Sequence, residues 1–210
     1  MRKINSKKQS RWLPGSNFRG SFAPLRLCVK NSFLSVCVLG FIALACWTES
    51  IYDQSVETIE GQTQPLSAYQ GKKILFITLP ITRTSGADSV LTSLDSLSDA
   101  STATLKIIAV PSYEDGYTQA IKDSLENWYR QYLDSNVLIT TGLYTRKSSG
   151  NQQDEVFKWL TYQTRNGVMN EDVDGPLNKF MVRANGELMG VLKARSKIGG
   201  GAMQRMLAAQ

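Results

Sequence analysis

The 210-residue sequence contains no histidine, and its three cysteines, Cys28, Cys37 and Cys46, all lie near the N-terminus. From Thr48 onward the chain therefore has neither a thiol nor an imidazole. This excludes disulfide bonds within residues 48–210, cysteine nucleophiles, zinc sites of cysteine and histidine, and acid–base catalysis by histidine. Any chemistry of this region must use hydroxyl, carboxylate, amide or cationic side chains.

Acidic side chains are absent from the first 30 residues, which hold eight of the 24 Lys and Arg residues. The other 16 basic residues face all 18 Asp and Glu residues, so residues 31–210 carry a formal charge of −2. The net charge of +6 therefore belongs to the N-terminus. Because the rest of the chain has no basic excess, we expect no binding to nucleic acid.

Residues 32–47, SFLSVCVLGFIALACW, form an uncharged run directly after the basic residues 1–31, which we expect to be disordered. A basic segment, an apolar run and then Ala43-Leu44-Ala45 have the layout of a secretory signal. The length of the basic segment, and Trp47 where an interfacial aromatic would lie, favour retention as a signal-anchor. We therefore expect one N-terminal membrane helix.

Two alternatives to the anchor remain open. Cleavage after Ala45 would release a secreted or periplasmic protein. Lipidation at Cys46 is the third interpretation, although Ala43 and Leu44 fit a lipoprotein cleavage box poorly. In each case the basic end stays inside, so we expect residues 48–210 to lie outside the cytoplasm.

Apolar runs and helical periodicities in residues 48–210 predict one α/β domain. The expected order is a hairpin at 55–66, a helical turn at 66–69, strands at 73–79, 105–110 and 136–140 with helices between and after them, a hairpin at 179–192 and a helix at 202–209. Strands that alternate with helices predict a parallel core. The last hairpin, with Asn185-Gly186 at its turn, adds an antiparallel edge.

For two of the predicted helices, the sequence also indicates the N-cap or the apolar face. Asp88 is the predicted N-cap of the first, whose apolar positions include Leu94. The second is predicted as a long helix with one apolar face, formed by Ile121, Leu125, Trp128 and Tyr132. Helical spacing favours core packing of Trp128, Tyr129 and Tyr132 over an aromatic binding patch.

Three motifs, in this order, resemble the glutathione peroxidase family, which has a thioredoxin-type fold. Residues 66–72, LSAYQGK, are similar to the family's L-S-x-Y-x-G-K, and residues 105–111 to its L-x-I-L-A-F-P strand. Residues 178–182 with Asn185-Gly186 are similar to x-K-F-L-I-D-x-x-G. The resemblance runs from about Ile51 to Met206. It implies a mixed sheet flanked by helices and, for the family, thiol-dependent reduction of hydroperoxides.

The resemblance also locates the positions of the family's catalytic residues. The reactive cysteine or selenocysteine of N-V-A-S-x-C-G falls on Thr84, or on Ser85 after a one-residue slip. The glutamine of F-P-C-N-Q-F-G falls on Glu114, and the tryptophan and asparagine of W-N-F-x-K-F fall on Gly175 and Pro176. All four catalytic residue types are replaced.

These replacements are incompatible with the chemistry of the family. Peroxide reduction needs a thiolate, whereas the hydroxyl of Thr84 does not ionise without a base and has no cycle of oxidation and reduction. We therefore expect a degenerate homologue that uses no cofactor or metal and acts as a binding or structural module, with a protein partner left open. The alternative is an active peroxidase or another enzyme that uses non-thiol chemistry around Thr84 and Glu114.

Other polar clusters have a simple interpretation beside a functional one. Thr84, Glu114 and Asp115 have oxygen ligands for a hard cation, but a helix-start hydroxyl and a solvated turn are favoured. Glu171-Asp172 with Asp174 lacks the spacing of a calcium loop and is expected to be a polar loop. Residues 199–201 are three glycines, which indicate a hinge rather than an anion cradle.

Overall fold

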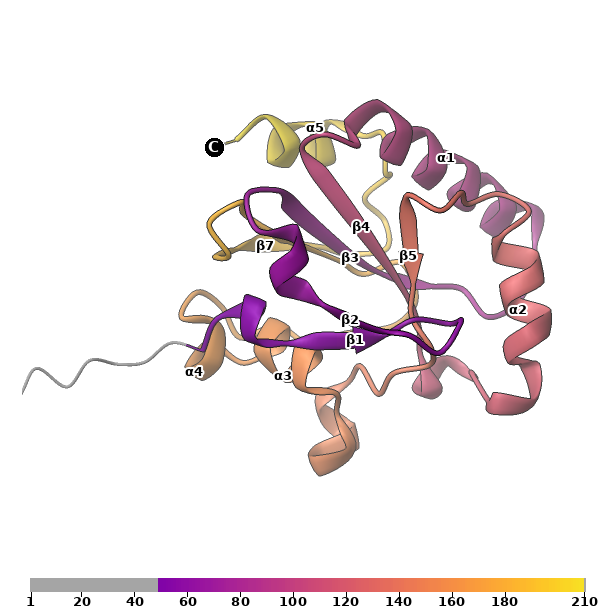
Figure 1. Cartoon of the computed structure of the whole chain (residues 1–210), viewed down its shortest axis with the longest axis horizontal. Coiled ribbons are helices and arrows are strands. Elements are labelled where there is room, and N and C mark those ends of the chain that lie inside the picture. Colours follow the sequence, from indigo (N-terminus) through magenta and orange to yellow (C-terminus); the bar gives the residue numbers. More distant parts are fainter. Residues whose placement is uncertain (1–48, 210) are drawn as a thin grey trace, which may run out of the picture. The chain divides into compact units, whose positions relative to one another are not determined.

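A computed structural model describes residues 49–209 (Figure 1). The basic segment 1–31 and the apolar run 32–47 lie outside the described residues, together with the predictions of a membrane helix, of cleavage and of lipidation. Within residues 49–209, no helix combines the length and apolar character needed to cross a bilayer.

A five-stranded sheet forms the centre of the described region, in the order β5-β4-β3-β6-β7 (Figure 1). Its strands are β3 (Lys73–Leu79), β4 (Leu105–Pro111), β5 (Val137–Ile139), β6 (Lys179–Val182) and β7 (Leu188–Leu192). The first three run parallel, whereas β6 pairs antiparallel with β3, and β7 pairs antiparallel with β6. The predicted parallel core with an antiparallel hairpin is confirmed.

Helices cover both faces of this sheet. They are α1 (Ser85–Ser101), α2 (Lys122–Tyr129), α3 (Glu155–Thr161), α4 (Gln163–Asn166) and α5 (Gly201–Ala208). Short 3-10 turns are η1 (Ile51–Asp53), η2 (Leu66–Tyr69), η3 (Tyr113–Asp115), η4 (Gln119–Ile121) and η5 (Lys147–Gln152). The predicted first hairpin is present as β1 (Ser55–Glu57) and β2 (Thr63–Pro65), which pair with each other.

Strand β3 divides the core into two halves because successive side chains of a strand point to opposite faces. Leu75 and Ile77 pack on the face that α1, α2 and α5 cover. Ile74 and Phe76 pack on the other face, with α3 and the β1–β2 hairpin. A strand that is covered on both faces reads as a continuous apolar run, which is why its bounds are evident in the sequence.

The predicted start of α1 is wrong. The N-cap is Thr84, whose side chain accepts a hydrogen bond from the backbone N–H of Ala87, and Asp88 lies one turn inside the helix. Asp88 instead accepts a 2.7 Å hydrogen bond from the indole N–H of Trp128 in α2. A carboxylate in the first turn still interacts favourably with the helix dipole.

The second helix is shorter than predicted. Ile121 belongs to the preceding 3-10 turn η4, and α2 ends at Tyr129, so Tyr132 lies beyond it. Trp128 and Tyr129 are buried, at 5% and 0% exposure, which confirms their place in the core. Tyr132 is half-buried and packs against this core.

Candidate functional site

The four positions that correspond to the catalytic residues of the resembling family gather around one edge of the sheet. Leu79 and Pro111 are paired at the ends of β3 and β4, so the segments that carry Thr84 and Glu114 leave the sheet side by side. Gly175 reaches the same edge, since its carbonyl accepts a 3.0 Å hydrogen bond from the hydroxyl of Thr78 in β3. Ligands of α/β proteins usually bind at such an edge.

Thr84 has a structural role at this edge. Its side-chain oxygen accepts a 3.1 Å hydrogen bond from the backbone N–H of Ala87 and caps α1. The predicted helix-start hydroxyl is confirmed. Ser85, the position reached by a one-residue slip, is the first residue of the helix and is exposed, as is Thr84.

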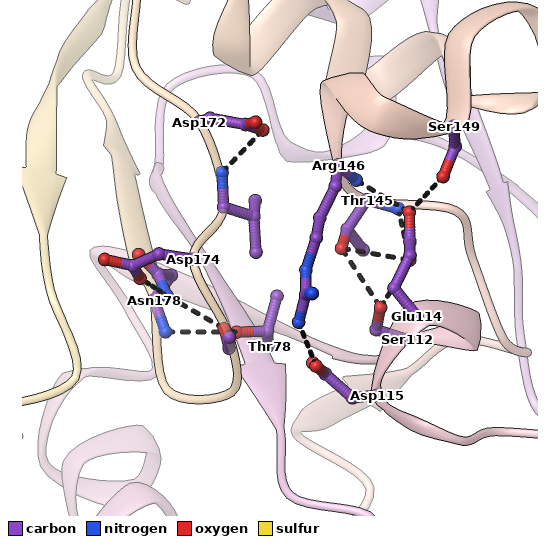
Figure 2. A network of polar contacts seen from close by, with 12 residues as sticks. Thr78, Ser112, Glu114, Asp115, Thr145, Arg146, Ser149, Asp172, Asp174 and Asn178 are labelled. Atoms are coloured by element: carbon purple, nitrogen blue, oxygen red, sulfur yellow. Dashed lines mark hydrogen bonds and ion pairs between the residues drawn. The ribbon is translucent and has the colours of Figure 1, made fainter.

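Glu114 is the centre of a dense polar network (Figure 2). The hydroxyls of Ser112 and Ser149 each donate to its carboxylate at 2.6 Å. The backbone N–H groups of Thr145 and Arg146 donate at 3.0 and 2.8 Å, and the Thr145 hydroxyl lies at 3.4 Å. The prediction of a solvated turn is therefore only partly correct, because Glu114 lies in a turn but is half-buried, and these donors engage both of its carboxylate oxygens.

Burial alone would raise the pKa of Glu114. The hydrogen bonds from Ser112, Ser149, Arg146 and Thr145 outweigh this effect and lower the pKa from 4.5 to about 2. At neutral pH the group is therefore a permanent anion whose lone pairs are occupied. It is poorly suited to act as a general acid or base, which needs a pKa near the working pH.

Asp115 is also not a solvated residue. Its side chain is 9% exposed and forms an ion pair with Arg146, whose side chain lies between the Glu114 network and Thr78 in Figure 2. Burial raises the pKa of Asp115, and the neighbouring Glu114 carboxylate adds to this, whereas Arg146 opposes it. Within residues 49–209, Asp115 Oδ2 and Arg146 Nε are buried without a hydrogen-bond partner.

The segment around Gly175 and Pro176 forms a tight turn at the start of β6. The Gly175 carbonyl accepts hydrogen bonds from the Thr78 hydroxyl and from Asn178 Nδ2, the latter at 2.8 Å. Asn178 Nδ2 also donates to Asp174 at 2.6 Å. Gly175 and Pro176 supply no functional side-chain group where the family has tryptophan and asparagine.

The acidic loop before this turn is held by basic groups. Lys193 lies 3.4 Å from Glu171 and 3.7 Å from Asp174, and Asp172 accepts a 3.0 Å hydrogen bond from the backbone N–H of Lys147. Across the described range 49–209, no group of three or more His, Cys, Asp or Glu side chains is placed to hold a metal ion. The interpretation as a polar loop agrees with these contacts.

A cavity of about 580 Å³ lies beside Thr84, between the β3–α1 turn and α2. Its lining is mixed: Ile81, Arg83, Ser124, Leu125, Asn127, Trp128 and Gln131. Arg83 at its rim is paired with Asp88 at 3.5 Å and donates to the Tyr132 hydroxyl at 3.3 Å. These groups offer hydrogen bonds and apolar contact but no nucleophile activated by a base.

Besides Ser112, sequence reasoning missed three distant residues of the Glu114 network, namely Thr145, Arg146 and Ser149. They lie 31 to 35 positions after Glu114 and belong to no motif, so no local pattern pointed to them. The network also does not include Thr84, whose hydroxyl serves α1. Thr84 and Glu114 therefore take part in two separate structural arrangements.

No family model and no curated protein matches this sequence. Solved structures do resemble the described domain, among them the following two. The crystal structure of Trgpx in apo form aligns with a TM-score of 0.56 and 14% sequence identity, over 75% of this chain and 93% of that chain. The crystal structure of T. cruzi GPX1 aligns with a TM-score of 0.53 and 12% identity, over 76% and 95%. At this identity the likeness concerns the fold, which is a thioredoxin-like mixed α/β fold.

Proposed function

We propose that this protein is a degenerate member of the glutathione peroxidase family that serves as a binding or structural module rather than as a peroxidase. The order of its three motifs and the likeness of its fold to Trgpx and GPX1 support the family. A shared fold is not evidence of a shared activity. Whether peroxidase activity is expected therefore depends on the residues at the site.

One observation is the main support for the proposed absence of peroxidase activity. The turn after β3, where the family places its reactive thiol, presents the hydroxyl of Thr84, and that hydroxyl is used to cap α1. A threonine hydroxyl needs a base to become a nucleophile, and the sequence has no histidine to supply one. Glu114 does not replace it because its pKa is about 2.

We also propose that the protein is anchored in a membrane. Residues 32–47 form a single-pass anchor, and the domain that begins at residue 48 lies on the side opposite the basic N-terminus, outside the cytoplasm. The uncharged run, the basic segment before it and Trp47 support this topology. The partner of the module is a protein or other component of that compartment.

The test of the functional proposal is a coupled assay. The full-length protein in detergent is supplied with hydroperoxide, glutathione, glutathione reductase and NADPH, beside an active glutathione peroxidase as a positive control. We expect NADPH consumption equal to that without protein. A clear rate above this background would overturn the proposal.

A further inference from the structure

The start of the described domain is held in a defined place. The backbone carbonyl of Glu49 accepts a 2.6 Å hydrogen bond from the indole N–H of Trp159 in α3. Its carboxylate accepts a 2.7 Å hydrogen bond from Gln54 and lies 3.3 Å from Arg165 in α4. The next residues continue into η1, where Ile51 is fully buried. The chain therefore enters the domain beside α3 and α4.

An exposed apolar side chain lies directly after α4. Within residues 49–209, Val168 is the one large hydrophobic residue that is exposed, at 44%. Gly167 ends α4 in the left-handed conformation, with φ 72°, and so turns the chain outward.

The turn that carries Val168 is held by one buried side chain. Asn166 is 7% exposed, and its Oδ1 accepts hydrogen bonds from the backbone N–H groups of Val168 and Met169 at 2.8 and 2.9 Å. Its Nδ2 donates to the carbonyls of Trp159, Leu160 and Met169 at 3.0, 3.3 and 3.0 Å. Both polar atoms of this amide are engaged in holding the turn, with the two N–H protons shared among three carbonyls, so the turn keeps Val168 exposed.

Trp159 connects these two features, since its indole holds Glu49 and its carbonyl accepts a hydrogen bond from Asn166. Arg165 makes a second connection, because it pairs with Glu49 and, at 2.6 Å, with Glu155. The start of the domain therefore lies beside α4, and the Val168 turn follows α4 directly. Glu49 and Glu155 are both paired with Arg165, which limits their repulsion from anionic headgroups.

We propose that this face, formed by α4 and residues 167–169, rests on the lipid bilayer, with the side chain of Val168 in the interfacial region. The inference depends on the proposed anchor at residues 32–47. In sequence, only Thr48 separates that run from Glu49, so an anchored domain has little freedom to leave the surface.

The free energy expected from burial of the Val168 side chain is small, but it is sufficient to orient a tethered domain. Burial of a partly exposed valine favours one orientation by roughly fivefold. A free domain would not bind a membrane through such a contact. A tether makes the second contact intramolecular, so a fivefold bias decides which face points to the bilayer. Because Glu49 lies so close in sequence to the proposed anchor, a lipid surface is the binding partner that we favour for this face.

The test uses the full-length chain with Cys28, Cys37 and Cys46 replaced by alanine and one new cysteine, either Val168→Cys or Asp123→Cys. Asp123 is an exposed residue of α2, which lies at the opposite end of the described domain from α4 in Figure 1. Each variant is labelled with a fluorophore and reconstituted into phosphatidylcholine vesicles with one quarter phosphatidylglycerol. A small fraction of the lipid carries a quencher near the headgroup.

We expect quenching of the label at position 168 to exceed that at position 123 by at least threefold. Equal quenching in protein that floats with the vesicles after an alkaline wash would overturn the proposed face and leave the anchor intact. Protein that does not float would overturn the anchor and the membrane-resting face together. Similar denaturation midpoints of both labelled variants show that neither label has unfolded the domain.

Discussion

The hydroxyl of Ser149 donates a 2.6 Å hydrogen bond to the carboxylate of Glu114 and so ties η5 to the end of β4 across 35 residues. Thr145 and Arg146 donate to the same carboxylate from the segment between them. A single anion thus organises the loop that follows β5 at the edge of the sheet. In the motif resemblance to the glutathione peroxidases, Glu114 is aligned with a glutamine, and in this structure its carboxylate has a structural role.

Glu114→Gln is the first test of this role, since it restores the family's residue type. The amide cannot accept from two hydroxyls and two backbone N–H groups as a carboxylate does, so we expect a loss of about 2 kcal/mol in the free energy of unfolding. Urea denaturation at pH 7 measures it. Glu57→Gln is the matched control, because Glu57 is exposed, and it should change the free energy by less than about 0.5 kcal/mol. Equal effects of the two substitutions would contradict the role of Glu114.

The low pKa of the Glu114 carboxylate also predicts how the free energy of unfolding depends on pH in the acidic range. Its pKa is about 2 in the folded protein and 4.5 ordinarily, so between these pH values the unfolded chain binds a proton that the folded chain does not. The contribution of Glu114 is therefore complete above pH 4.5 and is lost as the pH falls towards 2. The difference in unfolding free energy between wild type and Glu114→Gln should shrink over that range. A difference that stays constant from pH 6 to pH 3 would contradict the low pKa.

Lys179 predicts a second rise in stability with pH, in the alkaline range. It is 2% exposed in β6, its Nζ donates a 2.7 Å hydrogen bond to the Leu177 carbonyl, and burial lowers its pKa from 10.5 to about 8. Between pH 8 and 10.5 the unfolded chain keeps a proton that the folded chain has lost, so stability should rise with pH in this window.

Lys179→Met removes the buried charge and should stabilise the protein at pH 7 by about 1 kcal/mol, after the loss of one hydrogen bond. The alkaline rise in stability should be smaller in this variant, and what remains is expected from half-buried Lys106, whose pKa is also lowered by burial. Lys197→Met, at an exposed position, is the control and should leave the rise unchanged. Thermal or urea denaturation between pH 7 and 10 distinguishes them, and a rise of undiminished size in Lys179→Met would refute the assignment.

Thr84 should behave as a helix cap. Thr84→Ala leaves the N–H of Ala87 without its acceptor and should lower the free energy of unfolding by about 1 kcal/mol, whereas Thr84→Ser should retain most of the cap. Ser85→Ala, at the next exposed position, should have little effect. Denaturation curves of the three variants provide the comparison. An unchanged free energy of unfolding in Thr84→Ala would show that the hydroxyl does not stabilise the start of α1.

The order of the elements is predictable because most of them have strong local signals. The apolar runs at 73–79 and 105–110 agree with β3 and β4 to within one residue, since both strands are covered on two faces. The hairpin around Asn185-Gly186 is found from its turn residues. The N-cap of α1 is less clear, because Thr84 and Asp88 are both good caps and only the local backbone decides between them.

The site is less predictable than the fold. A turn of Glu, Asp and Gly is normally solvated, and nothing in residues 112–116 shows that Thr145, Arg146 and Ser149 will approach Glu114. These contacts depend on how the chain returns after β5, which is a tertiary property. The turn at Asn166 and Val168 is similarly hidden, because one buried amide with five hydrogen bonds has no sequence motif.

The most direct test of the central claim is the rate of hydroperoxide reduction by the full-length protein. Wild type, Thr84→Ala, Glu114→Gln and the variant with Cys28, Cys37 and Cys46 replaced by alanine are compared in the glutathione-coupled assay. Because the β3–α1 turn carries no thiol, we predict that all four consume NADPH at the rate measured without protein. A wild-type rate well above this background that Thr84→Ala or Glu114→Gln abolishes would contradict the account.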